Sequence, residues 1–377
     1  MNELTQQIRS FNWRAAEPLH ALLCLPGVAL PLLIGMPLGF PGTAVLMAGG
    51  AQTVGFGSFQ QPLYTRSGPM ALATVGIGIS AMVGALCRDN TPALLAAVLV
   101  WSIVYGLSTG ISSATGWVGQ QCCVFLIVSS AAASTPGTTH DLVRSALLRG
   151  AGVLAGGALQ TLCIFGLQRL WPRARTHFSK SDFNPKHLEV PFLREQLSPH
   201  SGTFVFTLRL AATTLLATVV YRHLSFPNAY WIGMTAVLIP KPEWALTAAR
   251  SVLRTAGTLL GALLSTLLVV TVHPRGFALT VLVLVFLYLS YLWTNVNYGA
   301  FSVVLTGYIC FLLAILHQPA HDVLLRRFGA TAAGCGIAIG VHLFVLGLRR
   351  ASHFTVQRVH TLEERLGWRR TSDVSVH

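Results

Sequence analysis

Charge is the property that this sequence has least of. Only 10% of its 377 residues are charged and only 12 are acidic, whereas about 25% of the residues of a typical soluble domain are charged. The mean hydropathy is +0.61. So few charged side chains cannot cover the water-facing surface of a chain of this length. The composition therefore excludes a soluble globular protein.

Cysteine and histidine patterns that bind metals are also missing. The seven cysteines include no CxxC pair, and each lies in or beside an apolar run, which favours a packing role. A His-Asp pair occurs twice, at His140 and at His321, but two adjacent residues do not form a catalytic triad. We therefore expect no catalytic residue, no metal site and no cofactor, and we do not expect an enzyme.

Basic residues, in contrast, are in excess. The 26 Lys and Arg residues give a formal net charge of +14, which is common in proteins that bind nucleic acid. Here, however, these residues stand between long apolar runs and not on the face of a soluble domain. We therefore expect a lipid bilayer as the partner and exclude nucleic acid.

Long runs without a charged residue determine the expected fold. A membrane span needs about 20 mainly apolar residues, and it must be helical because lipid offers no hydrogen-bond partners to the backbone. Three charge-free runs of 47, 51 and 46 residues (19–65, 90–140 and 276–321) have room for two spans each. Single spans fit the charge-free runs 67–87, 150–168, 223–240, 255–274 and 328–348, and the segment 203–221, which has Arg209 near its start, is another span. The sequence thus predicts an all-α, polytopic integral membrane protein with about twelve transmembrane helices.

The two halves of the chain resemble each other. Phe40-Pro41 precedes the second expected span and Phe226-Pro227 precedes the eighth, and a His-Asp pair followed by arginine precedes the last span of each half. Because each half holds an even number of spans, the two repeats are parallel, as in some transporters. We predict a first six-span repeat at 1–170, a cytoplasmic connector at 171–203, a second six-span repeat at 204–350 and a cytoplasmic tail at 351–377.

The basic residues also predict the orientation of the chain. With twelve spans both termini lie on one side, and that side receives nineteen of the 26 Lys and Arg residues. Cytoplasmic loops carry an excess of basic residues. We therefore expect both termini in the cytoplasm, together with the turn that contains Lys241.

That turn is the most unusual segment of the apolar second half. The stretch IPKPEW at 239–244 follows an expected span that is only just long enough to cross a membrane. Each proline disfavours helical structure at the residue before it. Arg250 and Arg254 are four residues apart, so they share one helix face at the start of the next span. Two guanidinium groups there can bind a carboxylate. The alternative is a turn whose basic residues only anchor the chain at the membrane surface.

Aromatic and polar residues surround this candidate anion site. Tyr230 and Trp231 are either interface anchors or stacking partners of an aromatic substrate. Asn297 is either a polar group at membrane depth or part of a turn. Glu243 lies close to Lys241 in the sequence and is our candidate for proton coupling, with a salt bridge that fixes the turn as the alternative.

The segments AYWIGMTAVLIP and ARSVLRTAGTLLGALL resemble the signature of the fusaric acid resistance family. Its relatives include aromatic acid exporters of the bacterial inner membrane and, more distantly, the aluminium-activated malate transporters of plants. The resemblance covers 209–264 well, and the first half keeps the six-span pattern without the motif. The matching positions are Tyr230, Trp231, Thr235, Pro242, Arg250, Arg254, Gly257, Thr258 and Gly261, and Arg209 matches the arginine that opens this repeat in relatives.

The resemblance implies an exporter in the bacterial inner membrane that moves organic, often aromatic, carboxylates and is coupled to protons. Small organic anions are the expected partners. Whether the protein also binds a periplasmic adaptor protein or forms a homo-oligomer is left open by the resemblance. A passive organic-anion channel that uses the same arginines is one alternative, and a membrane scaffold that transports nothing is another. The candidate substrate-binding residues are Arg209, Tyr230, Trp231, Thr235, Lys241, Arg250, Arg254 and Asn297.

Overall fold

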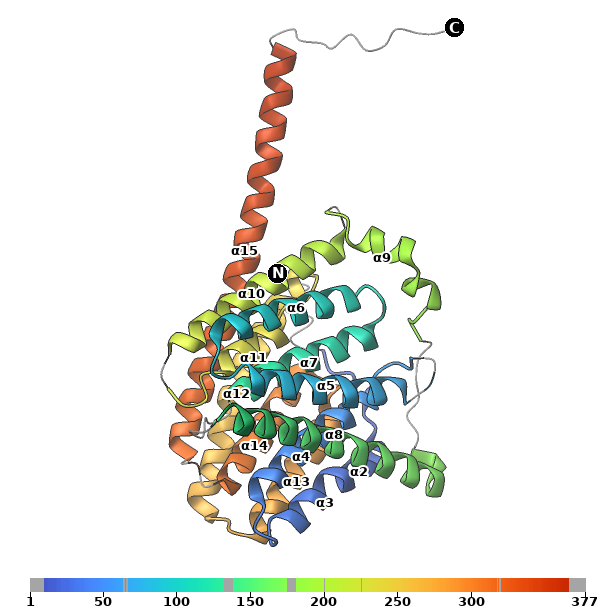
Figure 1. The fold of residues 1–377 in the computed structure, drawn as a ribbon, viewed down its shortest axis with the longest axis vertical. Coiled ribbons are helices and arrows are strands. Elements are labelled where there is room, and N and C mark those ends of the chain that lie inside the picture. Colours follow the sequence, from blue (N-terminus) through green and yellow to red (C-terminus); the bar gives the residue numbers. More distant parts are fainter. Residues whose placement is uncertain are drawn as a thin grey trace.

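The computed structural model is a bundle of helices (Figure 1). It describes residues 10–63, 65, 67–131, 138–174, 181–199, 201–224, 226–316, 318 and 320–365, and no strand occurs in this part of the chain. The predicted all-α class is thereby confirmed. The last twelve residues of the predicted tail, 366–377, lie outside the described residues.

The helices form two groups along the chain, which are separated by short elements at 172–196. The first group contains α2 (Pro18–Leu23), α3 (Leu25–Gly35), α4 (Pro41–Gly57), α5 (Gly68–Leu86), α6 (Thr91–Ser108), α7 (Ser113–Ser130) and α8 (Thr139–Leu170). The second contains α10 (Gly202–His223), α11 (Trp231–Leu238), α12 (Trp244–Val272), α13 (Phe277–Trp293), α14 (Tyr298–Ile315) and α15 (Ala320–Arg365). Around and between them lie η1 (Trp13–Ala15), η2 (Pro172–Ala174), η3 (Pro185–Leu188) and α9 (Val190–Gln196).

Signals in the sequence explain where several helices begin. The side chain of Asn90 accepts a hydrogen bond from the backbone of Ala93 at 3.0 Å and caps α6. Thr138 and Asp141 form a reciprocal capping box at the start of α8. Pro41 stands in the first turn of α4, where its fixed φ favours the helix and its missing N–H is not needed.

Eight helical segments of the described chain are long and apolar enough to cross a membrane. They are Trp13–Gly35, Gly68–Leu86, Thr91–Ser108, Thr139–Leu170, Gly202–His223, Trp244–Val272, Tyr298–Ile315 and Asp322–Gly347. The protein is therefore a multi-pass membrane protein, as predicted. The twelve-span count stays a prediction, because it also needs α4, α7, α11 and α13. Of these, α11 has only 8 residues, about 12 Å at the usual rise of a helix.

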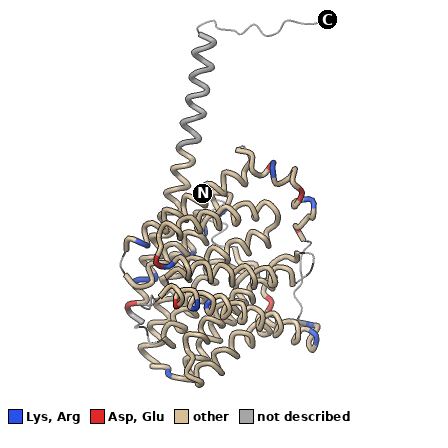
Figure 2. Tube along the Cα trace, in the orientation of Figure 1, with Lys and Arg blue, Asp and Glu red and all other residues tan. Residues whose placement is uncertain are grey.

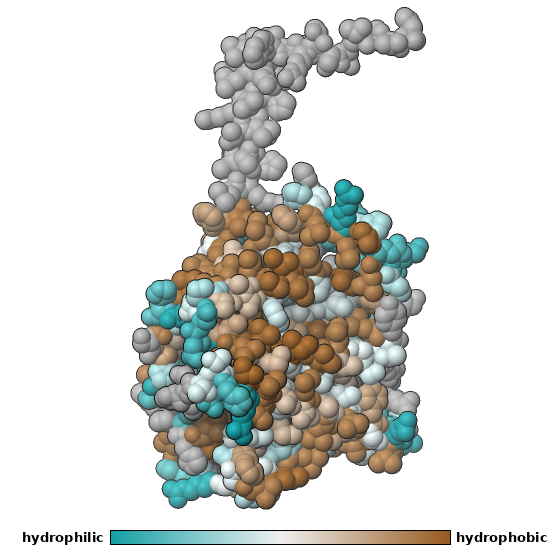
Figure 3. Space-filling view, viewed as in Figure 1, coloured by the Kyte–Doolittle hydropathy of each residue, from teal (hydrophilic) through white to brown (hydrophobic). Residues whose placement is uncertain are grey.

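The outer surface of the bundle has the character that lipid requires. Large apolar side chains are exposed along α5, α6 and α10, where Leu72, Val104 and Leu208 are 47%, 58% and 59% exposed. Figure 3 shows hydrophobic side chains across the middle of one face. A patch of this extent on a protein surface is typical of contact with a partner or a membrane.

Charged residues lie mostly at the two ends of this apolar zone. Figure 2 shows most of them toward the left and right edges of the bundle and only a few between the edges. The right edge carries α9 and the C-terminal end of α8. The helices thus run between two polar surfaces, which is the distribution expected across a bilayer.

Corresponding helices of the two groups have the same packing partners. In the first group α4 packs on α8, and α5 packs on both α7 and α8. In the second group α11 packs on α15, and α12 packs on both α14 and α15. This is the arrangement that an internal repeat predicts, and the repeat itself stays a prediction.

Close approach of helices depends on glycine at the crossing points. A Cβ atom added at Gly261 on α12 would collide with the backbone carbonyl of Val303 on α14. One added at Gly156 on α8 would collide in the same way with the carbonyl of Met47 on α4. Small residues at such contacts allow two helix backbones to meet.

The two groups of helices share their hydrophobic interior. One buried cluster combines α3, α4 and α5 with α13 and α14, and the other combines α6 and α7 with α10, α11 and α15. Hydrogen bonds join the groups as well, from the Tyr291 hydroxyl to the Gln52 carbonyl at 2.9 Å and between the Ser102 and Thr214 hydroxyls at 2.7 Å. The interface between the groups is therefore part of the core, and it surrounds the site.

Candidate functional site

A cavity of about 600 Å³ lies between the two groups of helices. We call it the central cavity. Its walls come from α4 and α7 of the first group and from α12, α14 and the α11–α12 connection of the second group. Its volume falls in the range of about 300–1,000 Å³ that is usual for small-molecule sites.

Three cationic side chains border the central cavity. They are Lys241, Arg250 and Arg254, and no Asp or Glu occurs among the residues described as its lining. Arg250 and Arg254 lie on one face of α12, as their spacing predicted. Arg254 is only 2% exposed, and its Nε atom has no hydrogen-bond partner in the described part of the chain. The cavity therefore attracts an anion and offers it guanidinium donors.

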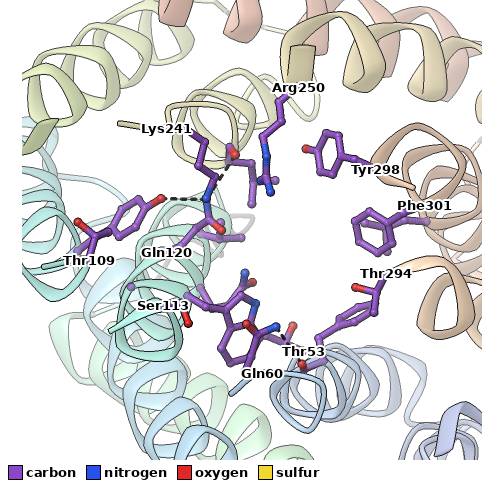
Figure 4. A pocket seen from close by; sticks show the side chains of 18 of the residues that line it. Thr53, Gln60, Thr109, Ser113, Gln120, Lys241, Arg250, Thr294, Tyr298 and Phe301 are labelled. Carbon is purple, nitrogen blue, oxygen red and sulfur yellow. Dashed lines mark hydrogen bonds between the residues drawn. The ribbon is translucent and has the colours of Figure 1, made fainter. Parts of the chain in front are cut away.

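The remaining walls are neutral, polar and aromatic. Figure 4 shows Lys241 and Arg250 on one side, with Thr53 and Gln60 across the cavity from them and Tyr298 and Phe301 on a third side. The Arg250 guanidinium carbon lies 4.7 Å from the centre of the Tyr298 ring, a cation–π contact that holds the arginine side chain in place. The cavity can thus receive the carboxylate of a ligand at one wall and its ring at another.

The proline-containing α11–α12 connection is held in place by Arg209 and Gln120, neither of which is one of the three cations that border the cavity. The Arg209 guanidinium donates to the backbone carbonyls of Lys241 and Pro242, the latter at 3.2 Å. The Gln120 amide of α7 donates to the carbonyls of Val237 and Leu238 at 3.3 and 3.4 Å. Val237 and Leu238 are the last two residues of α11, and the carbonyls at the end of a helix have no partner within the helix. Arg209 and Gln120 therefore fix the position of Lys241 at the cavity edge.

Lys241 lies in the α11–α12 connection, outside the helices that could cross a membrane. Burial, and in second place the positive charge of Arg250, lower the pKa of Lys241 to about 7. The lysine is therefore positively charged below about pH 7 and neutral above it. The charge of the cavity falls as the pH rises through neutrality.

Affinity for an anion of constant charge is therefore expected to fall by about tenfold when the pH rises from about 6 to about 8, the usual effect of losing one charge-assisted contact. Benzenesulfonate does not titrate in this range, so its Kd from calorimetry reports only the protein. The Lys241→Met variant should bind equally at both pH values. A pH step that survives in Lys241→Met would contradict this assignment.

A second cavity, of about 1250 Å³, lies at the other end of the same helices. We call it the opposite cavity. Thr43 at the start of α4, Ala131 just after α7 and Leu316 just after α14 line it, whereas the central cavity contacts α4 and α7 near their other ends. The opposite cavity is also basic, because its described lining contains Arg144, Arg149 and Arg222 but only one acidic residue, Asp141.

Among the described residues, one side chain borders both cavities. Ile309, in the middle of α14, lines the central cavity and the opposite cavity. Val124 and Leu305 line only the central cavity beside it, and Phe125 and Leu312 line only the opposite cavity. The barrier between the two cavities is therefore short and apolar.

The predicted site residues divide between these places. Lys241, Arg250 and Arg254 meet at the central cavity, and Tyr230 lines the opposite cavity. Trp231 and Thr235 are buried outside the lining of both, and Arg209 holds the connection.

Asn297 and Glu243 face neither cavity in the described lining. The Asn297 side chain caps α14 by accepting from the backbone of Gly299 and Ala300, and it donates to the carbonyl of Ser10 at 2.9 Å. This corresponds to its interpretation as a turn residue. Glu243 is exposed and precedes α12.

Several site residues could not be selected from the sequence. Gln52, Gln120 and Tyr298 line the central cavity, yet the first two lie in the half without the family motif. Ile309 is one apolar residue among many in its run. Arg327 lies between the runs 276–321 and 328–348, where the sequence predicts a loop, but it is buried in the core. Only the isolated glutamines, which are polar groups at membrane depth, give a signal of their own.

Comparison with known proteins supports the family prediction. Residues 216–341 match the family model described as fusaric acid resistance protein-like. The uncharacterized protein YhfK of Escherichia coli (strain K12) is 30% identical over 151 residues, which are 40% of this chain and 21% of YhfK. The uncharacterized protein ORF2 of Neisseria gonorrhoeae is 32% identical over 75 residues, which are 20% of this chain and 18% of ORF2. No solved structure matches.

The chain thus spans about a fifth of the length of the curated relatives that it matches. The matched family segment begins within α10 and ends within α15. It contains α11, α12 and α14, which supply the cations and one wall of the central cavity. Residues 216–341 of this membrane protein are therefore similar to the fusaric acid resistance protein-like family.

Proposed function

We propose that this protein transports organic anions across the bacterial inner membrane and binds them in the central cavity. The observation that carries the proposal is the pair of cavities at opposite ends of α4, α7 and α14, both lined by arginine and separated by Ile309. A solute that passes this barrier moves from one end of the bundle to the other. The family match of the second half supports the same function.

The chemistry of the central cavity favours carboxylates that carry an aromatic ring. Arg250 and Arg254 can donate to a carboxylate, and Lys241 adds positive charge. Phe56, Trp117 and Phe301 also line the cavity and offer faces for ring stacking. The substrate is thus an organic, aromatic monocarboxylate such as benzoate. This function requires no catalytic step and no cofactor.

The orientation and the repeat belong to the same proposal. Two parallel six-helix repeats, with both termini in the cytoplasm, would place the central cavity on the cytoplasmic side, because this cavity contacts the turn that contains Lys241. The opposite cavity would then open toward the periplasm. Export would carry the anion from the first cavity to the second.

Proton coupling needs a group that titrates where the substrate binds. Glu243 is exposed and outside the cavity lining, so its carboxylate would act only from a distance. Lys241 borders the cavity, and its pKa is lowered to about 7. We therefore assign the pH response of transport to Lys241.

Purified protein in liposomes tests the proposal with radiolabelled benzoate and an imposed pH gradient. Accumulation above the electrochemical equilibrium of benzoate, abolished when the gradient is collapsed, is expected for a proton-coupled exporter. The vesicles without protein measure the passive entry of benzoic acid. Flux that only equilibrates would establish the alternative, a passive channel. No protein-dependent flux for any of several aromatic and aliphatic carboxylates would favour the membrane scaffold.

A further inference from the structure

Two consecutive arginines of α15 have opposite environments. Arg326 donates to Asp322 at 3.2 Å, and its side chain is 32% exposed. Arg327 is only 1% exposed, and none of its three guanidinium nitrogens has a hydrogen-bond partner in the described chain. Its guanidinium lies over the Trp231 ring, whose centre is 4.7 Å from the guanidinium carbon.

Such a charge is unfavourable in a protein interior unless something compensates it. A buried arginine is usually paired with an acid or fully hydrogen-bonded, and Arg327 has neither in the part of the chain that is described. The nearby guanidinium of Arg254 increases the problem, because the two positive charges repel each other. A cation–π contact with Trp231 offsets only part of this penalty.

Three buried hydroxyl groups without partners lie on helices that contribute neighbours of Arg327. The Oγ1 atoms of Thr235, Thr258 and Thr306 are buried and have no hydrogen-bond partner among the described residues. Each lies four residues, or about one helical turn, from a neighbour of Arg327. Those neighbours are Trp231 on α11, Arg254 on α12 and Cys310 on α14. The helices α11, α12 and α14 thus each carry an unused hydroxyl group about one turn from a neighbour of Arg327.

This region also joins the two cavities. Arg254 lines the central cavity. Tyr230 lines the opposite cavity, and its ring lies 5.9 Å from that of Trp231, the residue beneath Arg327. Arg327 therefore lies between a residue of one cavity and a neighbour of the other.

We infer that Arg327 and Arg254 form an intermediate binding station for a carboxylate that moves between the central and opposite cavities. The inference rests on the proposed function for the direction of movement, but the anion site itself stands on the unpaired guanidinium. The planar guanidinium of Arg327 offers two parallel donors to a carboxylate, and Arg254 adds a second positive charge nearby. An anion there satisfies the donors and separates the two positive charges.

The Arg327→Met variant distinguishes this role from a structural one. Methionine has a similar length and removes an uncompensated charge, so the unliganded protein should melt at the same or a higher temperature than the wild type. Benzoate flux in liposomes should fall by about tenfold or more, as for the loss of one charge-assisted contact. The Arg326→Met variant alters the adjacent, surface-facing arginine and should keep its flux.

Thermal shifts test the site without relying on transport. Benzoate, compared with equal sodium chloride, should raise the melting temperature of Arg250→Ala, in which the station is intact. It should not raise that of Arg250→Ala/Arg327→Met. If the wild type shows no flux but this difference holds, the proposed function fails and the anion site stands.

The opposite result removes the inference and leaves the function. Normal flux in Arg327→Met, with a benzoate shift that persists in the double variant, would show that no anion binds at Arg327. A lower melting temperature of unliganded Arg327→Met with normal flux per folded protein would assign a packing role. Should Arg327→Met fail to fold, Arg327→Lys keeps the charge but not the two parallel donors. It is then expected to fold and to lose flux, and normal flux would overturn the inference.

Discussion

The double variant Arg250→Ala/Arg254→Ala is expected to lose at least a hundredfold of its benzoate transport at low substrate concentration. A hydrogen bond to a charged group contributes roughly 1.5–3 kcal/mol, and each 1.4 kcal/mol is about tenfold in binding. Both guanidinium groups border the central cavity and no described acidic residue of its lining competes for them. The loss should appear first as a higher KM, because the arginines hold the carboxylate in the bound state.

Matched variants separate charge from packing in this experiment. Arg275→Ala removes an exposed arginine beyond the far end of α12 and should leave the flux unchanged. Arg250→Lys/Arg254→Lys retains both charges without the guanidinium fork and is expected to lie between the wild type and the double alanine variant. Wild-type flux in a well-inserted double alanine variant would refute the proposal that the central cavity is the anion site.

Shortening Ile309 to alanine should open a leak between the two cavities. Ile309 is the side chain that lines both, so its removal is expected to join them without a conformational change. Benzenesulfonate trapped in liposomes should then escape about ten times faster or more, in the absence of a pH gradient, if the barrier falls by at least the 1.4 kcal/mol that corresponds to tenfold. Ile309→Trp should have the opposite effect and block the passage.

The control for this variant lies one helical turn away. Leu305 lines the central cavity and not the opposite cavity, so Leu305→Ala enlarges one cavity and keeps the barrier. Both variants lose buried apolar volume, and a comparable drop in melting temperature is expected for each. An equal leak in Leu305→Ala, or no leak in Ile309→Ala, would show that the barrier lies elsewhere.

The central cavity illustrates why only part of a site can be predicted from one sequence. Arg250 and Arg254 stand four residues apart in a single helix, so their common face follows from helix geometry alone. Their partner Tyr298 is on α14, and the amide of Gln120 comes from the other half of the chain. Such contacts depend on which helices pack together and on the rotation of each helix.

Arg326 and Arg327 make the same point more sharply. They are adjacent and chemically identical, and the sequence places both at the end of a predicted loop. Successive residues of a helix point about 100° apart, and therefore one faces Asp322 near the surface while the other faces Trp231 in the core. The direction of that rotation is decided by the packing of α15 against α11 and α12.

The sequence by itself determined the all-α class, the membrane environment, the resemblance of the second half to a known family and the positions of the cations on α12. These properties are local, because hydropathy, helical spacing and a family motif are each written in one continuous segment. Only the tertiary structure decided that two cavities lie at opposite ends of the same helices, that Ile309 lines both, and that Arg327 is buried in the core. Those features arise where helices that are far apart in the chain pack together. The lipid-facing and core-facing sides of an apolar helix have similar compositions, and therefore the sequence does not reveal which side packs against which neighbouring helix.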